Sequence, residues 1–424
     1  MFRIKQTIFA MSASHRRFLW LKISESVRRI PVIPHLTSYI RRSSVFLFSL
    51  YLSFLFTGFV ISISKPTGIV YQGRDKAPTF QPQLVGELCE SQSVGAEKRI
   101  FFIESSGGKC LRPRQACAIE SAARTNPDMN IYVHMALYPA PGSPEDREPC
   151  ARTNPDMNIY VHMALYPAPG SPEVEGGYGL NAHCQMMDIL TKQFPNIKIV
   201  REDLTQHLLG TPLEALLQSG KLEKSKFSYQ HLSDAVRIAM LHKSGGIYLD
   251  LDVITLRSLN CLRNTAGEVR SAEYKAGIEN GVLIFDKGHG LLNHYMRLMT
   301  QIYDPSSREG IGPNGLLKAA GEFCGFGVCE GCDFGQLWIC RDNWNITVLY
   351  TEAFYPIPFR NRIRFYEPTF PLSELDNLQT SYLVHVYGSG HGAQVSHSSL
   401  YGFLAQRFCP SVYTISSQSR VFNF

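Results

Sequence analysis

The chain has 424 residues, of which 44% are hydrophobic and 18% charged, so it is long enough for one large folded domain and its composition excludes wholesale disorder. The formal net charge of +6 depends on residues 1–44, which carry nine Lys and Arg against one acid, Glu25. The remainder is close to neutral, and we expect no nucleic-acid partner, because a folded nucleic-acid-binding domain needs a basic face.

An apolar run at 45–63 contains no charged residue and has the length of a helix that crosses a bilayer. Arg41 and Arg42 precede it and only Lys65 follows closely, so the positive-inside rule puts 1–44 in the cytoplasm and the rest of the chain in the lumen. We therefore predict a single-pass type II signal-anchor helix. A cleaved signal peptide and a buried core helix are the alternatives, and the late start and the length of the run argue against the signal peptide.

Residues 64–97 are rich in Pro, Gly, Gln and Ser, which predicts a stem between the anchor and a lumenal domain at 98–424. All eleven cysteines lie beyond the anchor, where an oxidising lumen favours disulfides. A zinc site stays open as an alternative for one cluster, although its spacing fits poorly: Cys324, Cys329, Cys332 and Cys340. Asn345, followed by Ile and Thr, is a predicted N-glycosylation site.

Short apolar runs alternate with helical patterns along the lumenal domain. Helices are predicted at 115–124 and at 232–243, and the second ends at Gly245-Gly246. Strands are predicted at 100–103, 130–137, 197–200, 247–249, 282–285, 348–350 and 383–386. This alternation predicts an α/β fold whose sheet contains parallel pairs.

The segment 123–145 recurs residue for residue as 151–173. Exact identity is not typical of structural repeats, and solenoids need at least three units. Only one copy can fill the single strand position that the pattern offers. We expect the first copy to fill it, because it keeps the short connection from the preceding helix.

Asp250 and Asp252 end an apolar strand, which is where open α/β sheets place their ligand sites. Alternate strand residues point the same way, so both carboxylates can face one divalent ion such as Mg²⁺ or Mn²⁺. The alternative is two solvated carboxylates in a strand-end turn. A calcium loop does not fit, because the glycine and distal glutamate of such a loop are missing.

Asp234 and Arg237 are three residues apart and therefore lie on one face of the predicted helix. An intrahelical salt bridge is one interpretation. The other interpretation is sugar binding, because the helix leads directly into the double glycine and the aspartate pair. The carboxylate would accept hydrogen bonds from sugar hydroxyls, and the guanidinium would act as a rigid hydrogen-bond donor.

These residues form an S-D-x-x-R…G-G-x-Y-x-D-x-D block that resembles the retaining glycosyltransferases of the DxD-containing GT-A fold, which is Rossmann-like. More closely, the chain resembles the α-1,4-galactosyltransferase and α-1,4-N-acetylglucosaminyltransferase group over residues 98 to 410. The supporting stretches are 100–105, 118–124, 280–285, 352–358 and 385–387. The duplicated segment departs from the family pattern.

The resemblance implies a UDP-sugar donor, Mn²⁺ with Mg²⁺ as the alternative, retention at the anomeric carbon, and a type II Golgi membrane protein. Matched by position, Asp250 and Asp252 would hold the metal, with His385 as a third ligand. Asp234 and Arg237 would contact the donor sugar, and Asn280 would lie beside the anomeric centre. The predicted catalytic set is Asp252, Asp250, Arg237 and Asn280.

No residue of the sequence is an evident nucleophile, so same-face attack is expected, with the metal and Arg237 stabilising charge on the leaving diphosphate. A glycosphingolipid is the expected acceptor. The donor sugar and the oligomeric state stay open. The alternative from another class is a non-catalytic lumenal carbohydrate-binding or partner module on a decayed transferase fold, with the duplication in its favour and the intact Asp and Arg residues against it.

Overall fold

A computed structural model of the chain describes residues 70–71, 99–137, 180–269, 277–308, 310–325, 337–388 and 395–418. The predicted anchor at 45–63 and the second copy at 151–173 lie outside these ranges, as does the stem apart from Val70–Tyr71. Within the ranges, no helix has the length and hydrophobicity needed to span a bilayer.

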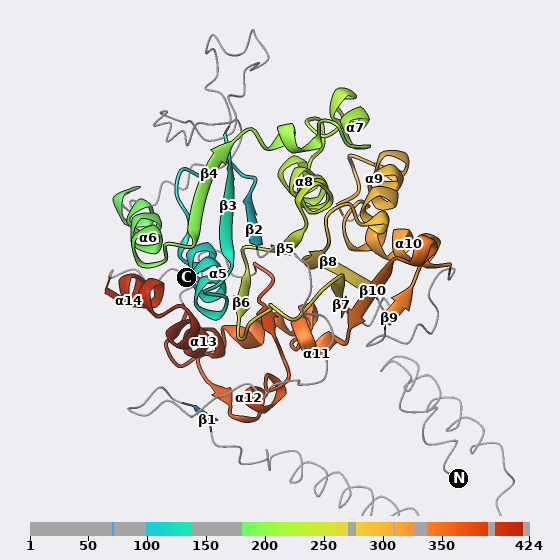
Figure 1. Cartoon of the computed structure of the whole chain (residues 1–424). Helices are drawn as coiled ribbons and strands as arrows, with labels where there is room; N and C mark the ends of the chain where they lie inside the picture. The colour runs from blue at the N-terminus through green and yellow to red at the C-terminus, as the bar shows by residue number, and fades with distance from the viewer. Residues whose placement is uncertain are drawn as a thin grey trace, which may run out of the picture. The chain divides into compact units, whose positions relative to one another are not determined.

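The central sheet has the order β4-β3-β2-β5-β8-β7-β10-β9 in the described residues (Figure 1). Its strands are β2 (Arg99–Glu104), β3 (Asn130–Ala136), β4 (Ile197–Glu202), β5 (Gly246–Leu249), β7 (Thr265–Val269), β8 (Gly277–Phe285), β9 (Leu337–Ile339) and β10 (Asn345–Leu349). Strands β4, β3, β2 and β5 are parallel, whereas β8 is antiparallel to both β5 and β7. The prediction of an α/β fold with parallel pairs is confirmed.

Two short ladders lie beside this sheet. Strand β6 (Val253–Thr255) pairs antiparallel with β12 (Leu383–His385), and β1 (Val70–Tyr71) pairs with β11 (Phe370–Pro371). The first ladder matters for function, because β6 begins one residue after Asp252 and β12 ends at His385.

Each face of the sheet packs on its own set of helices. In β2, Ile100 and Phe102 point into one core and Phe101 and Ile103 into the other, as the two-residue period of a strand requires. The second core holds α8 (Ser228–Ser244), α9 (Gly290–Ile302) and α10 (Pro313–Cys324), with η2 (Leu204–Leu208) and α7 (Glu214–Gln218). The first core holds α5 (Pro113–Thr125), α6 (Leu180–Gln193), α11 (Thr351–Phe354), α12 (Ser373–Asn377), α13 (Leu400–Phe408) and α14 (Pro410–Gln418).

The duplicated sequence supplies the sheet from its first copy, as predicted. Strand β3 lies inside that copy and pairs with β2 on one side and β4 on the other. Helix α5 runs into it through a short turn, with the Asn126 amide donating to the carbonyl of Ala122.

Six of the cysteines in the described ranges are in disulfides. Cys117 of α5 is bonded to Cys409, which follows α13, and Cys324 is bonded to Cys340. Cys110 and Cys261 are disulfide-bonded as well. The zinc alternative for the cysteine cluster is therefore wrong, because two of its four members are used in a disulfide.

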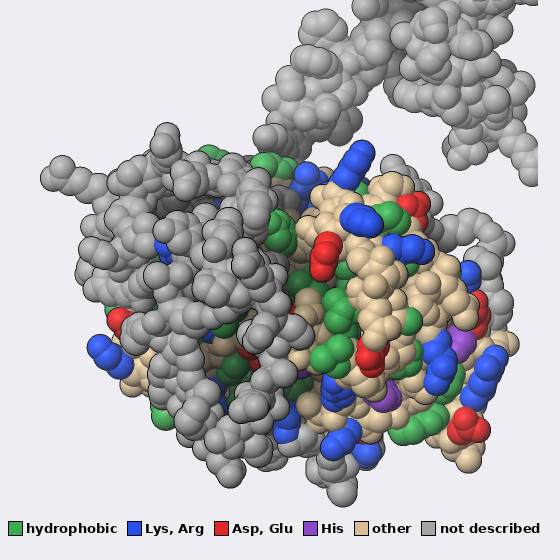
Figure 2. Space-filling view, turned by 90° about the horizontal axis from the view of Figure 1, so that it is seen from above, with side chains coloured by type: hydrophobic (Ala, Val, Ile, Leu, Met, Phe, Trp, Pro, Cys, Tyr) green, Lys and Arg blue, Asp and Glu red, His purple; other side chains and the backbone are tan. Residues whose placement is uncertain are grey.

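Charge is mixed on the surface that Figure 2 displays. Lys and Arg side chains are scattered among acidic, polar and hydrophobic ones on the described part of that face. Asn345, the predicted glycosylation site, is exposed at the start of β10.

Candidate active site

Helix α8 and strand β5 are joined by two glycines that fix the entry to the site. Gly245 has a φ of 69° and Gly246 has a φ of 112°. Residues other than glycine rarely adopt this backbone conformation. A Cβ on Gly245 would lie 2.7 Å from the backbone nitrogen of Lys287, and one on Gly246 would lie 2.9 Å from the carbonyl oxygen of Arg99. The helix stop predicted from the double glycine is confirmed, and it sets β5 against both β2 and β8.

The β6–β12 ladder brings His385 to the aspartate pair. His385 pairs with Val253, and the amide of Val386 donates to the carbonyl of Asp252 at 2.8 Å. The Nε2 atom of His385 is 3.4 Å from Oδ2 of Asp250 and 3.2 Å from Oδ1 of Asp252. One ligand atom from each of these residues lies within 4.8 Å of the other two. The three predicted metal ligands therefore converge.

Gly281 lets strand β8 approach this group closely. Its carbonyl accepts from the amide of Asp250 at 2.8 Å. A Cβ here would lie 2.7 Å from Oδ2 of Asp250 and 3.0 Å from Nε2 of His385. The sequence analysis began this strand at residue 282 and left the glycine outside it, whereas β8 runs from Gly277 to Phe285. A glycine inside a strand, as a mark of close approach, was the signal that could have found it.

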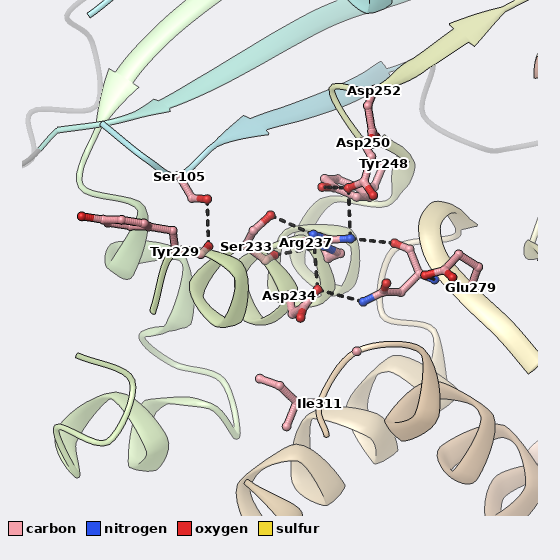
Figure 3. A network of polar contacts seen from close by, with 12 residues as sticks. Ser105, Tyr229, Ser233, Asp234, Arg237, Tyr248, Asp250, Asp252, Glu279 and Ile311 are labelled. Atoms are coloured by element: carbon pink, nitrogen blue, oxygen red, sulfur yellow. Dashed lines mark hydrogen bonds and ion pairs between the residues drawn. The ribbon is translucent and has the colours of Figure 1, made fainter. Parts of the chain in front are cut away.

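Arg237 lies at the centre of a buried polar network (Figure 3). Its Nε donates to the Ser233 carbonyl, Nη1 donates to the Asn280 carbonyl at 2.9 Å, and Nη2 donates to the Ser233 hydroxyl. Nη1 is also 3.1 Å from Asp250, and Nη2 is 3.3 Å from Asp234. All three guanidinium nitrogens thus have protein partners.

Two further contacts order the same network. The guanidinium carbon of Arg237 lies 4.4 Å from the centre of the Tyr248 ring, and the Tyr248 hydroxyl donates to Asp250 at 2.6 Å. The side-chain amide of Asn280 donates to Asp234 at 2.9 Å. The structure therefore brings Asp234, Arg237 and Asn280 together, and it adds Tyr248, which the sequence analysis did not single out.

The electrostatics of the aspartate pair favour an added cation. Burial opposes ionisation of Asp250, but Arg237 and hydrogen bonds from His385 and Tyr248 outweigh it and lower the pKa of Asp250. Burial raises the pKa of Asp252. Burial alone would lower the pKa of His385, yet the carboxylates, with Asp252 first, raise it to about 9. A divalent cation would favour ionisation of both carboxylates.

Glu279 is a second residue that the sequence analysis missed. It precedes Asn280 on β8, and burial raises the pKa of its carboxyl group to about 7. Its Oε1 accepts from the Asn280 amide at 3.2 Å. Nothing in a local pattern distinguishes this glutamate, because its surroundings come from α8, β5 and β12.

The donor set fits a divalent metal. Two carboxylates and one imidazole form a mixed oxygen and nitrogen set, which suits Mn²⁺ better than Mg²⁺, since Mg²⁺ prefers oxygen ligands alone. One contact has to change, because Nδ1 of His385 now accepts from the Tyr387 amide at 3.1 Å. Metal binding through Nε2 needs the ring proton on Nδ1.

A second group with metal-ligand side chains lies at the ends of β3 and β4. Glu202 binds His134 at 2.5 Å and His207 at 2.8 Å through one carboxylate oxygen. Both imidazoles contact the same carboxylate oxygen, so we interpret this cluster as a structural contact that joins η2 to strands β3 and β4.

Two family regions match most of the domain. Residues 112–268 match the glycosyltransferase sugar-binding region containing the DXD motif, and residues 284–416 match the alpha 1,4-glycosyltransferase conserved region. The first region contains Asp234, Arg237, Asp250 and Asp252, and the second contains His385. The chain is a homologue of the α-1,4-glycosyltransferases.

Named relatives agree with this family. The mouse lactosylceramide 4-alpha-galactosyltransferase is 28% identical over 323 residues, which is 76% of each chain. The human protein of the same name is 25% identical over 371 residues, 87% of this chain and 90% of its own. Human alpha-1,4-N-acetylglucosaminyltransferase is 26% identical over 226 residues, 51% of this chain and 61% of its own. The named relatives are α-1,4-glycosyltransferases, and the similarity supports a catalytic role as a transferase for this chain.

Among solved structures, the galactosyltransferase LgtC in complex with donor and acceptor sugar analogues matches 74% of this chain and 95% of its own. Its sequence identity is 13% and the TM-score is 0.33.

Proposed function

We propose that the chain is a retaining glycosyltransferase of the GT-A fold. It transfers a hexose or N-acetylhexosamine from a UDP-sugar, in α-1,4 linkage, to the terminal sugar of a glycosphingolipid. The observation that carries this proposal is the convergence of Asp250, Asp252 and His385 at the end of β5, inside the regions that match the family.

Asp250, Asp252 and His385 would hold Mn²⁺, with Mg²⁺ as the alternative. Bound there, the ion would supply Lewis-acid stabilisation of the diphosphate as it leaves. The contribution of this chain is to fix the two carboxylates before substrate arrives. Arg237 and Tyr248 hold Asp250 from one side, and Gly281 leaves the space that the ligand atoms need.

Arg237 acts chiefly as a positioning residue in this proposal. Its nitrogens bind Asp234, Asp250, Ser233 and the carbonyl of Asn280, so direct contact with the leaving diphosphate requires the release of one partner. Asp234 and Asn280 are joined by a hydrogen bond and form the adjoining polar surface. They are the candidates for contact with the donor sugar and for the position beside the anomeric centre.

Retention is proposed to follow from same-face attack. The bond between the anomeric carbon and the phosphate oxygen breaks while the acceptor oxygen bonds to that carbon on the same face. The proton of the acceptor hydroxyl passes to the leaving phosphate, so no protein nucleophile is needed. Glu279 is the candidate nucleophile for a covalent route, because it is a half-buried carboxyl next to Asn280 on the same strand.

The proposed location is the Golgi membrane, with a cytoplasmic tail at 1–44, an anchor at 45–63 and a stem at 64–97. The exposed position of Asn345 is compatible with a glycan on that side chain. The eleven cysteines, several of them disulfide-bonded, support a lumenal domain.

A donor screen tests the proposal and separates it from a non-catalytic carbohydrate-binding module. The full chain in detergent is assayed with Mn²⁺, lactosylceramide and UDP-galactose, UDP-N-acetylgalactosamine or UDP-N-acetylglucosamine, and released UDP and product linkage are measured. The proposal predicts release with one donor, an α-1,4 product and loss of both on chelation. A folded protein that binds sugar but releases no UDP with any donor would favour the binding module.

A further inference from the structure

The 3-10 segment η4 (Phe359–Phe365) exposes hydrophobic side chains beside positive charge. Phe359 is 54% exposed and Ile363 is 65% exposed, and they are two of five large hydrophobic side chains exposed among the described residues. Arg360 is exposed between them, and Arg362 lies over the Phe359 ring at 4.1 Å from its centre. The sequence from 354 to 366 holds three arginines and no acid.

The segment η4 is fixed to the folded domain by an ion pair and by buried side chains on either side of its exposed part. Arg364 forms an ion pair with Glu374 of α12, whose side chain is buried. Ile357 and Phe365, on either side of the exposed part, are buried in the first core. The exposed side chains therefore stand on a fixed platform, and their exposure is not the fraying of a loop.

A short series of ring contacts leads from η4 to the active site. The rings of Phe359 and Tyr387 are 5.4 Å apart between centres, and those of Tyr387 and His385 are 4.6 Å apart. Nε2 of His385 is 3.2 Å from Asp252. The exposed segment thus lies two ring contacts from the proposed metal ligands.

We propose that η4 is a membrane-docking element that rests on the surface of the bilayer carrying the acceptor lipid. This inference rests on the proposed function. Phe359 and Ile363 would enter the boundary between head groups and acyl chains, as the apolar face of an interfacial segment does, and Arg360 and Arg362 would contact lipid phosphates. Docking at this place would bring the head group of a membrane-embedded acceptor to the active site.

The dimensions of the segment favour a lipid surface over a protein partner. A stable protein interface buries about 800 Å² on each side, with a hydrophobic centre and a polar rim. The segment η4 offers two hydrophobic side chains flanked directly by arginines. A lipid surface requires no matching shape, and arginine stems and aromatic rings both suit its polar boundary.

The first test compares an acceptor in the membrane with an acceptor in water. The full chain is reconstituted in phosphatidylcholine vesicles with lactosylceramide, or with soluble lactose, and kcat/KM is measured for each acceptor. In Ile363→Ser combined with Arg360→Gln, the ratio of lipid to soluble activity should fall at least about fivefold, because burial of one large apolar side chain is worth about that factor or more. This variant leaves the Phe359–Tyr387 contact in place, so soluble activity should persist.

The matched control is Ile339→Ser, since Ile339 is 71% exposed on β9. Its ratio should equal that of the unchanged protein. Equal ratios for all three proteins would overturn the docking role while leaving the proposed transferase intact. Absence of activity on both acceptors would contradict the transferase itself.

A second measurement does not depend on activity. Ile363→Trp and Ile339→Trp are each reconstituted in vesicles with brominated acyl chains, and the fluorescence of the unchanged protein is subtracted. Quenching should be strong for the tryptophan at 363 and weak for that at 339. Equal quenching at both positions would overturn the proposal even if the transferase assays succeed.

Discussion

Two residues of the site act by positioning the side chains of their neighbours, one by leaving space for them and the other through its charge. Gly281 is the clearest case, since its missing side chain admits both Oδ2 of Asp250 and Nε2 of His385. The network around Arg237 is a second case, because one buried cation orients two carboxylates from different elements.

Gly281→Ala should therefore impair metal binding more than folding. The added methyl group would displace the ligand atoms, and such displacements cost about 10²-fold in rate. Mn²⁺ affinity and UDP release should both fall. Gly277→Ala, on the same strand, meets only Val269 at 3.3 Å and is the control. Equal activity of the two variants would contradict the role of Gly281.

Glu279 predicts a pH dependence of stability in metal-free protein. Because burial raises its pKa from 4.5 to about 7, the folded state retains a proton that the unfolded state has lost. The contribution of the protonated Glu279 carboxyl to the free energy of unfolding is thus fully present below pH 4.5, and it is lost as the pH rises through 7. Glu279→Gln should flatten thermal stability between pH 5 and 8, by at most about 3 kcal/mol before solvent screening. An unchanged pH profile would contradict this.

At the scale of elements, the sequence predicted those whose signal is local. The period of α8 and its double glycine, the apolar strands β2, β3 and β5, and the position of Asp250 were all available from spacing. The start of α8 at Ser228, the strands β7 and β9, and the helices α9 and α10 were not predicted. The pairing of β6 with β12, which places His385 at the site, joins residues more than a hundred positions apart and has no local signature.

The Cys117–Cys409 disulfide joins α5 to the end of α13 across a separation of 292 residues. Replacing both cysteines with alanine should lower the free energy of unfolding by about 2–5 kcal/mol, because the unfolded chain loses a long covalent loop. The control pair, Cys324 and Cys340, closes a separation of 16 residues and should cost less when replaced. Thermal unfolding without reductant measures both, and a smaller loss for Cys117–Cys409 would contradict the argument.

At the scale of the whole molecule, the duplicated segment is the departure from the family pattern. In the described residues, the first copy supplies β3, which lies between β2 and β4. Deleting residues 124–151 leaves the same sequence as deleting residues 146–173, because the copies are identical. The shortened chain keeps β3 and its connection to α5.

This deletion should preserve the fold and the transferase activity of the full chain. Thermal unfolding and UDP release, measured on both proteins, provide the comparison. A shortened chain that gains activity absent from the full chain would mean that the extra copy blocks the donor site, and a shortened chain that fails to fold would mean that the extra copy is structural.

The central claim is that Asp250, Asp252 and His385 form a metal site required for use of a UDP-sugar. The most direct measurement is Mn²⁺ titration together with UDP release on the full chain, the Asp252→Asn variant and an Asp188→Asn control, since Asp188 is exposed on α6. We expect Asp252→Asn to lose Mn²⁺ binding and to release UDP about 10³-fold more slowly, with an unchanged midpoint of thermal unfolding. Asp188→Asn should match the unchanged protein in all three measurements. Full Mn²⁺-dependent activity in Asp252→Asn would contradict the account.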